Sequence, residues 1–295
     1  MATDESGFNL EVIGEWSESM TFEVTAERLI AYAAATNDDL APHAAGEYGV
    51  PVFAVVPPFP ILASSTMAAV PDELMMRVLH GEQDIRIHRP IRPGETLTCR
   101  AKVTGVHGRS SGVVVTALVE TTSAGEPVND QYFTAFFRGG QLDGGYGEEP
   151  PAHGFPEALR DREPDAQVVQ KYDEDQTWRY AEASGDPMPI HTDEEFAKAM
   201  GLPGIIVHGL CTMAFTSRAV IETACPEDPA RLKRIAVRFS STAFPRNTIT
   251  TSIWDTGTNE QGEGTYAFET SSDEGASIIK DGLAEVAPAA GGADA

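Results

Sequence analysis

Apolar and polar residues follow two patterns along this chain, and together they predict helices followed by strands. Residues 25–36 carry apolar side chains at helical spacing, and Thr25 stands where a helix N-cap is favoured. Residues 97–103 and 112–122 alternate with a period of two and are rich in Val and Thr, which is typical of strands. Residues 131–138 make a further strand candidate.

The same order of elements restarts in the second half. Residues 141–163 are dense in Gly, Pro and charged side chains, so we interpret this segment as a linker. A strand-like run at 168–172 and a helical stretch at 175–183 follow it, and an apolar, small-residue run predicts a long helix at 211–223. Four further strands are expected at 235–240, 248–255, 264–271 and 275–286. The Ala/Gly-rich tail from Pro288 predicts disorder.

An internal repeat relates the two halves. A shift of 148 residues places YAAATNDDLAPH (32–43) on YAEASGDPMPIH (180–191), and five of the twelve positions are identical, including the Tyr, the Asp and the His. Further along the shift becomes 152, which places residues 92–97 on residues 244–249. A drift of four residues is one loop insertion, and the order of the matches is preserved. We therefore interpret the chain as a duplication of about half its length.

These patterns divide the chain into four parts: an N-terminal unit (1–140), the linker (141–163), a C-terminal unit (164–287) and the tail (288–295). At 295 residues the chain is long enough for two domains of ordinary size. Its hydrophobic fraction of 41% is adequate for a core in each.

The candidate chemistry lies in the stretch YAEASGDPMPIH, which ends at His191. Asp186 and His191 stand five residues apart in a Gly/Pro-rich turn, and 17 residues later the pair His208-Gly209 opens the long apolar run. This combination resembles the hydratase 2 motif of the MaoC-like dehydratases, members of the hotdog-fold superfamily. Their usual pattern is Gly-Asp-x-Asn-Pro-(Ile/Leu)-His, and this chain keeps all of it except the Asn, which is Met188.

The resemblance implies an α+β, double hotdog fold, in which each of two units wraps an antiparallel sheet around a central helix. It implies reversible hydration of a trans-2-enoyl-CoA to the (R)-3-hydroxyacyl-CoA, or the reverse dehydration. Asp186 and His191 would grip the water and move its protons, while the N–H of Gly209 would act as oxyanion donor to the thioester. No metal is implied, and no cofactor beyond the coenzyme A or acyl carrier protein pantetheine that the substrate carries.

The first copy of the repeat lacks one of these parts. Asp38 and His43 persist there, but the position that corresponds to Gly209 is Pro57, which has no N–H to donate. We therefore interpret the N-terminal unit as a non-catalytic copy that shapes the acyl pocket. Because two more prolines follow Pro57 closely, its helix is expected to start late, around residues 61–70, or to be distorted. A shortened helix would open space for a longer acyl chain.

Further residues are expected to bind the substrate. Those that flank the predicted oxyanion donor are Pro203, Gly204, Val207 and His208. The densest cluster of basic residues, with Arg231, Lys233 and Arg234, could bind the phosphates of coenzyme A. An equally good interpretation of the basic cluster is a set of solvated charges at the end of a strand.

Charge and composition narrow the partners. A net charge of −24 argues against nucleic acid and anionic membranes, which require basic surfaces, and it fits coenzyme A only if the pocket has a local basic mouth. The acidity could equally reflect a salt-adapted host. No run approaches the roughly 18 apolar residues of a membrane span, and the acidic N-terminus lacks the features of a signal peptide. Three cysteines match no metal or disulfide spacing. We expect a cytoplasmic acyl-CoA enzyme, with a homodimer possible.

Two other functions stay open, besides the simple one in which Asp186 only caps a Gly-Asp-Pro turn. An acyl-CoA thioesterase of the same fold would usually carry its carboxylate on the central helix, but residues 210–220 contain no Asp or Glu. A non-catalytic acyl-CoA-binding or partner subunit is favoured by Met188, because a thioether cannot replace the hydrogen bonds of Asn.

Overall fold

The computed structural model describes residues 7–289, and the expectation of disorder from residue 290 onward falls outside that range. The chain divides into two compact units, each described here by itself. The first unit takes residues 7–23, 57–88 and 96–152, and the second takes residues 24–56, 89–95 and 153–289. Within residues 7–289, no helix has both the length and the apolar composition needed to span a membrane.

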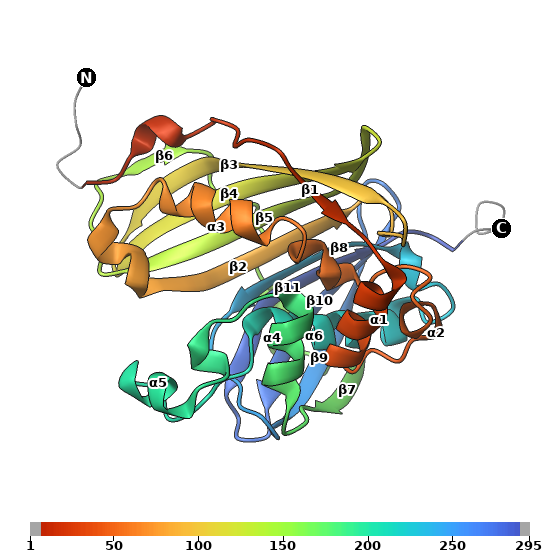
Figure 1. Ribbon diagram of the computed structural model, residues 1–295. Coiled ribbons are helices and arrows are strands. Elements are labelled where there is room, and N and C mark those ends of the chain that lie inside the picture. The colour runs from red at the N-terminus through yellow and green to blue at the C-terminus, as the bar shows by residue number, and fades with distance from the viewer. Residues whose placement is uncertain (1–6, 290–295) are drawn as a thin grey trace. The chain divides into compact units, whose positions relative to one another are not determined.

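The first unit is an antiparallel sheet that carries the short α-helix α3 (Figure 1). Its strands follow the order β1-β3-β4-β5-β2, and β6 pairs with β3. Helix α3 packs on β3 and β4, where Leu62 joins buried Ala and Val residues of the two strands. The elements are η1 (Leu10–Val12), β1 (Met20–Glu23), α3 (Phe59–Met67), η3 (Asp72–Arg77), β2 (Val78–Ile87), β3 (Thr96–Arg109), β4 (Gly112–Ser123), β5 (Glu126–Arg138) and β6 (Gly145–Gly147).

The second unit repeats this plan with more helices (Figure 1). Its strands follow the order β7-β9-β10-β11-β8, and α6 packs on the sheet. The helices are α1 (Ala26–Ala35), α2 (Ala41–Ala44), η2 (Pro51–Val55), η4 (Glu157–Leu159), α4 (Gln176–Ser184), η5 (Pro189–His191), α5 (Glu194–Ala199), α6 (Gly209–Ala224) and η6 (Pro229–Arg231). The strands are β7 (Ala166–Lys171), β8 (Leu232–Phe239), β9 (Thr248–Thr258), β10 (Gly264–Ser272) and β11 (Ser277–Val286).

The two sheets have the same topology, because shifts of 148 and then 152 residues bring the first strand order onto the second. The contact between α1 and α4 displays the repeat directly. The hydroxyls of Tyr32 and Tyr180, 148 residues apart, are hydrogen-bonded at 3.1 Å, and both side chains are fully buried. The structure thus confirms the double hotdog plan, with a sheet and a helix in each unit.

The predicted elements are confirmed with small changes in their ends. Thr25 caps α1, since its hydroxyl accepts the N–H of Arg28 at 3.3 Å. The alternating pattern of β9 buries Ile249, Thr251 and Ile253, as expected of a strand with one face on the core. The sequence patterns missed β1, β2, β6, α2 and α5. Most of these are short, and β2 mixes charged and apolar residues without a clean period.

The boundaries of the two compact units differ from those of the sequence repeats. Residues 24–56, which belong to the first repeat, cluster with the second unit and supply α1, α2 and η2. The segment 141–163 contains β6 and η4. The division into an N-terminal hotdog (1–140), a linker (141–163) and a C-terminal hotdog (164–287) stays a prediction.

The central helices of the two copies differ as the prolines predict. Helix α6 has 16 residues and starts at Gly209, whereas α3 has nine and starts only at Phe59, with prolines at positions 57, 58 and 60. Proline can occupy the first turn of a helix but donates no N–H there. The late, short helix of the first copy is therefore confirmed, while its effect on acyl-chain length stays a prediction.

Candidate functional site

The loop after α4 presents Asp186. Helix α4 ends at Gly185, whose φ of 74° is left-handed and suits glycine. The N–H of Asp186 donates to the hydroxyl of Ser184 at 3.3 Å, and one carboxylate oxygen accepts the N–H of Met188 at 3.1 Å. An Asp side chain that binds the backbone two residues on makes a turn of its own. A carboxylate oxygen of Asp186 lies within 4.8 Å of a ring nitrogen of His191 and of His208.

His191 closes the short helix η5, which Pro189 begins. Its Nδ1–H donates to the carbonyl of Ile206 at 2.8 Å, so Nε2 carries the lone pair and has no hydrogen-bond partner among the described residues. The side chain is 8% exposed. Burial lowers the pKa of His191, while the Ile206 carbonyl and the charge of Asp186 act in the opposite direction. The result is a neutral imidazole that can accept a proton.

His208 packs against this histidine. The two rings are stacked with centroids 3.6 Å apart and planes 21° apart. Nε2 of His208 lies 3.4 Å from the backbone oxygen of Asp186, and Nδ1 is buried without a hydrogen-bond partner among the described residues. Burial, and next the neighbouring His191, lower the pKa of His208 to about 3, so this ring is neutral as well.

Asp186, His191 and His208 form one cluster, in which a carboxylate oxygen and one nitrogen of each ring lie within 4.8 Å of one another. Such a cluster could hold a metal ion by residue type. However, an imidazole binds a metal in the plane of its ring, and two stacked planes only 21° apart do not converge on one ion. The arrangement suits a small hydrogen-bonding molecule such as water. The absence of a metal from the reaction stays a prediction.

Gly209 is the first residue of α6, directly after His208, which is the N-cap. The carbonyl of His208 accepts the N–H of Thr212 at 3.1 Å, which closes the first turn. The N–H of Gly209 precedes that turn and donates to no backbone carbonyl within the described chain. It therefore sits at the positive end of a 16-residue helix, adjacent to the cluster, as an oxyanion donor requires.

The other predicted neighbours of Gly209 have structural contacts. The N–H of Val207 donates to the carbonyl of Ala243 at 2.8 Å, which ties the segment before α6 to the loop after β8. A Cβ on Gly204 would lie 3.3 Å from the carboxylate of Glu194. Pro203 is exposed in the same loop. A role for these three residues in substrate binding stays a prediction.

The structure does not bring the predicted basic cluster into the Asp/His site. Arg231 and Lys233 donate to backbone carbonyls at 2.8 and 3.3 Å, and Arg234 pairs with Glu285 at 3.2 Å. Strand β8 ends with Phe239 against Gly209, since a Cβ at position 209 would lie 3.1 Å from the Phe239 ring. Five residues of strand separate this end from Arg234, roughly 17 Å at about 3.3 Å per residue.

The Asp/His pair of the first copy is closed. Asp38 and His43 lie 3.0 Å apart, from carboxylate oxygen to Nδ1, and their side chains are 0% and 1% exposed. The ring of Tyr48 packs edge-on against His43 at a centroid distance of 5.3 Å. Because the carboxylate and the imidazole are bonded directly and buried, no substrate can reach between them.

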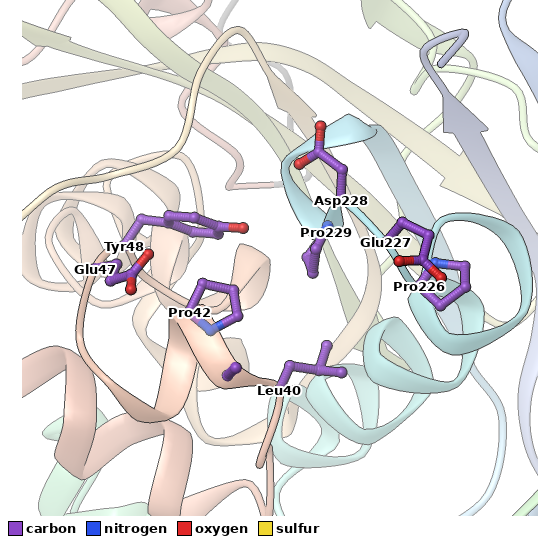
Figure 2. Close-up of a pocket in the computed structure, with 9 residues that line it drawn as sticks. Leu40, Pro42, Glu47, Tyr48, Pro226, Glu227, Asp228 and Pro229 are labelled. Carbon is purple, nitrogen blue, oxygen red and sulfur yellow. The ribbon is translucent and has the colours of Figure 1, made fainter. Parts of the chain in front are cut away.

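A hollow of about 400 Å³ is lined by Pro42, the residue before His43, and by Tyr48, whose ring packs on His43. Figure 2 shows the residues that line it. One wall is formed by residues of the segment 40–48, including Tyr48, and the other by the segment 226–229 after α6. Glu47, Glu227 and Asp228 give the hollow an acidic lining. That lining is unsuited to the phosphates of an acyl-CoA.

Two groups of the site were not predicted from the sequence. The carbonyl of Ile206 fixes His191, and the ring of Tyr180 lies 4.8 Å from that of His208. A backbone acceptor carries no signal in residue type. Tyr180 did carry one, because it is repeated at position 32, but its contact with the site requires the fold.

Comparison with known proteins agrees with the motif. Residues 156–276 match the family model described as "MaoC like domain", and residues 43–139 match the one described as "MFE-2 hydratase 2 N-terminal domain". The chain is similar to 3-hydroxyacyl-thioester dehydratase Y of Mycobacterium tuberculosis (32% identity, 92% of this chain and 96% of that protein). It is also similar to a probable enoyl-CoA hydratase 2 of Dictyostelium discoideum (32% identity, 72% of this chain and 71% of that protein).

Solved structures agree as well. A MaoC-like dehydratase from Phytophthora capsici superposes with a TM-score of 0.83 at 30% identity, over 96% of this chain and all of that one. A Mycobacterium tuberculosis protein described as a double hotdog superposes with a TM-score of 0.58 at 14% identity, over 91% and 95% of the chains, which supports the fold alone. The chain belongs to the family of MaoC-like dehydratases and hydratase 2 enzymes, and it is a hydro-lyase built from two hotdog units.

Proposed function

We propose that this protein adds water reversibly across the 2,3-double bond of a trans-2-enoyl-CoA, giving the (R)-3-hydroxyacyl-CoA. The observation that carries the proposal is the cluster of Asp186 and His191 beside the N-terminus of α6. It places an acid–base pair next to an unused backbone N–H in one site. The names of the relatives, enoyl-CoA hydratase and 3-hydroxyacyl-thioester dehydratase, support the same reaction.

The proposed steps follow from the two side chains. One water is held between the carboxylate of Asp186 and Nε2 of His191. As its oxygen adds to C3, Nε2 of His191 takes a proton from it, and the same proton is then delivered to C2 while Asp186 holds the water. Both groups end in the protonation states in which they began, and the dehydration runs through the same steps in reverse. A positioned acid–base group of this kind contributes about 10²–10⁴-fold.

The N–H of Gly209 would stabilise the charge that develops on the thioester oxygen, a contribution on the order of 3 kcal/mol for one donor. The first copy has Pro57 at this position and a directly bonded Asp38–His43 pair, so we assign turnover to the second copy alone. No metal or redox cofactor takes part in this scheme.

The substrate class includes thioesters of coenzyme A or of acyl carrier protein, and both stay open. Cytoplasmic location is part of the proposal. Some relatives are named as peroxisomal. One is enoyl-CoA hydratase 2 of Arabidopsis thaliana, which is 32% identical to this chain over 60% of each protein. A homodimer is likewise a prediction.

One specific observation favours a second candidate, a non-catalytic acyl-CoA-binding subunit. Met188 replaces the Asn of the family motif, and its side chain is 44% exposed rather than bonded into the loop. A thioesterase is disfavoured, because Glu222, the carboxylate in the last turns of α6, is paired with Arg218 at 2.8 Å.

The test is to mix purified protein with crotonyl-CoA and with longer trans-2-enoyl-CoAs and to follow the loss of the conjugated enoyl absorbance. Turnover that disappears in Asp186→Asn supports the hydratase, and stereochemical analysis of the product then decides the (R) assignment. Binding of the enoyl-CoAs without turnover at any chain length would reject hydration and leave the binding subunit.

A further inference from the structure

We propose that His208 is a positioning residue: its ring holds His191 out of a direct bond with Asp186, and so keeps between them the space in which water binds. The proposal goes beyond the proposed function, and only its kinetic readout rests on hydration being the reaction.

His208 contacts every part of the proposed machinery. Its ring stacks on His191 at 3.6 Å, its Nε2 lies 3.4 Å from the backbone oxygen of Asp186, and the next residue is Gly209. Two further contacts hold His208 itself. It forms the N-cap of α6, and its ring lies 4.8 Å from the ring of Tyr180. A ring fixed at both the helix and the tyrosine is a rigid surface for His191 to rest on.

The first copy shows the arrangement that arises without such a ring. The residue that corresponds to His208 is Val56, whose side chain is small and aliphatic. There the imidazole of His43 turns its Nδ1 to the carboxylate of Asp38 at 3.0 Å. In the second copy Nδ1 of His191 instead reaches the carbonyl of Ile206 at 2.8 Å.

Two loops that share the Asp and the His at the same spacing thus give two orientations of histidine. The loop itself does not decide between them, because both aspartates bind the N–H two residues on at 3.1 Å. The groups packed on each histidine differ: the ring of His208 and the carbonyl of Ile206 in the second copy, and the edge of the Tyr48 ring in the first. The carbonyl and the stacked ring together hold His191 in the open orientation.

His208 does not need to exchange a proton for this role. It is 2% exposed, and with a pKa of about 3 it is an uncharged ring at neutral pH. If it bears its proton on Nε2, that proton is directed at the backbone oxygen of Asp186, and Nδ1 is left without a partner, as the structure has it. The ring is therefore a support and not a third acid–base group.

The experiment compares three variants at this position with the unchanged protein. His208→Val introduces the residue of the first copy, His208→Phe keeps a stacking ring without nitrogens, and His208→Gln keeps an N–H donor without a ring. For each we measure kcat and KM with crotonyl-CoA, and the titration of ¹³C/¹⁵N-labelled His191 by NMR. Thermal unfolding of each variant checks that it is folded.

For His208→Val we expect kcat to fall by about 100-fold, the size of a misplaced acid–base group, with KM little changed. His191 should then bond to Asp186, and its pKa should rise by about one unit or more. His208→Phe should keep most of kcat and the low pKa of His191. His208→Gln should resemble His208→Val.

Two results would overturn the proposal. One is a His191 titration in His208→Val that matches the unchanged protein. The other is loss of activity in His208→Phe with retention in His208→Gln, which would assign the effect to the bond with the Asp186 loop. If the unchanged protein hydrates no enoyl-CoA, the proposed function fails, and the NMR titrations alone still decide the role of His208.

Discussion

The Asp/His loop occurs twice in this molecule, and the two copies share nearly all of their local backbone design. A left-handed residue precedes each aspartate, Asn37 with φ of 52° in one copy and Gly185 with φ of 74° in the other. Each aspartate then binds the N–H two residues on, and each histidine lies in a short helix that starts with a proline in its first two positions. The loop alone therefore does not make an active site.

The difference between the copies lies in what faces the loop. In the first copy the pair is bonded at 3.0 Å and buried, and Pro57 supplies no N–H. In the second copy His191 is turned to the carbonyl of Ile206, the ring of His208 covers it, and Gly209 opens a 16-residue helix. The acid and the imidazole form a buried, hydrogen-bonded pair in one copy and a candidate catalytic pair in the other.

Removal of the carboxylate should affect the two copies very differently. Asp186→Asn should lower kcat by about 10³-fold, because an acid–base group is lost while the shape is kept. Asp38→Asn should leave kcat close to that of the unchanged protein. It should cost stability instead, about 1–3 kcal/mol, because a single amide oxygen cannot accept both the Nδ1–H of His43 and the N–H of Leu40.

Enoyl-CoA kinetics and denaturant unfolding of the two variants provide the measurements. Equal losses of kcat in both variants would contradict the assignment of turnover to the second copy. A stable Asp38→Asn protein would show that the closed pair contributes little to the fold.

Gly209→Pro gives the second copy the residue that the first copy has at position 57. Gly209→Pro removes the proposed oxyanion donor at the first helical position, where proline is otherwise tolerated, and should lower kcat by about 10²–10³-fold. Gly209→Ala is the matched control. It adds the same Cβ, 3.1 Å from the ring of Phe239, but keeps the N–H.

We expect Gly209→Ala to retain far more activity than Gly209→Pro in the same hydration assay. If both variants lose activity equally, crowding against Phe239 explains the loss, and the N–H of Gly209 is not the donor.

The sequence allowed much of this architecture to be predicted. The alternating Val/Thr-rich runs and the Thr25 cap gave the long strands and α1, because these signals are local. The repeat predicted two similar units, and Pro57 predicted the late start of α3. These features depend on residue type and spacing, which a sequence displays directly.

The rest depends on contacts between distant segments. The basic residues Arg231 and Arg234 suggested a phosphate site, which stays a prediction. That one donates to a backbone carbonyl and the other pairs with Glu285 could not be read from the sequence, because a charge in a sequence does not show its partner. The open orientation of His191 depends on a carbonyl and a ring that come 15 and 17 residues later. Only the fold brings these groups together.

His208, whose ring has no counterpart in the first copy, should make the stability of the protein depend on pH. The pKa of His208 is lowered to about 3 in the folded protein against 6.5 ordinarily, so the folded state resists its protonation. Above pH 6.5 the ring is neutral in both the folded and the unfolded state, and the free energy of unfolding is at its full value. As the pH falls from 6.5 toward 3, the unfolded state takes up the proton first and the free energy of unfolding decreases. At pH 5 the loss is about 2 kcal/mol of unfolding free energy. The lowered pKa of His191 acts in the same direction.

Denaturant unfolding at pH 7 and at pH 5 measures this effect in the unchanged protein and in His208→Phe. The variant should lose about 2 kcal/mol less between the two pH values. An identical pH dependence in both proteins would mean that His208 is not held neutral by burial.

The smallest effect is expected where the second copy departs from its own family. Met188→Asn restores the usual motif, and because the side chain is 44% exposed the change should hardly affect folding. The loop is already fixed through the backbone: the N–H of Met188 binds Asp186, and its carbonyl accepts the N–H of His191 at 3.0 Å. An added amide can therefore improve the position of Asp186 only slightly. Because one hydrogen bond contributes about 1 kcal/mol, kcat should rise only a few-fold.

Leu40→Asn, the equivalent change in the first copy, should leave kcat unchanged. A rise of 100-fold or more in Met188→Asn would show instead that the second copy, too, has moved away from catalysis, and that the two copies differ in degree and not in kind.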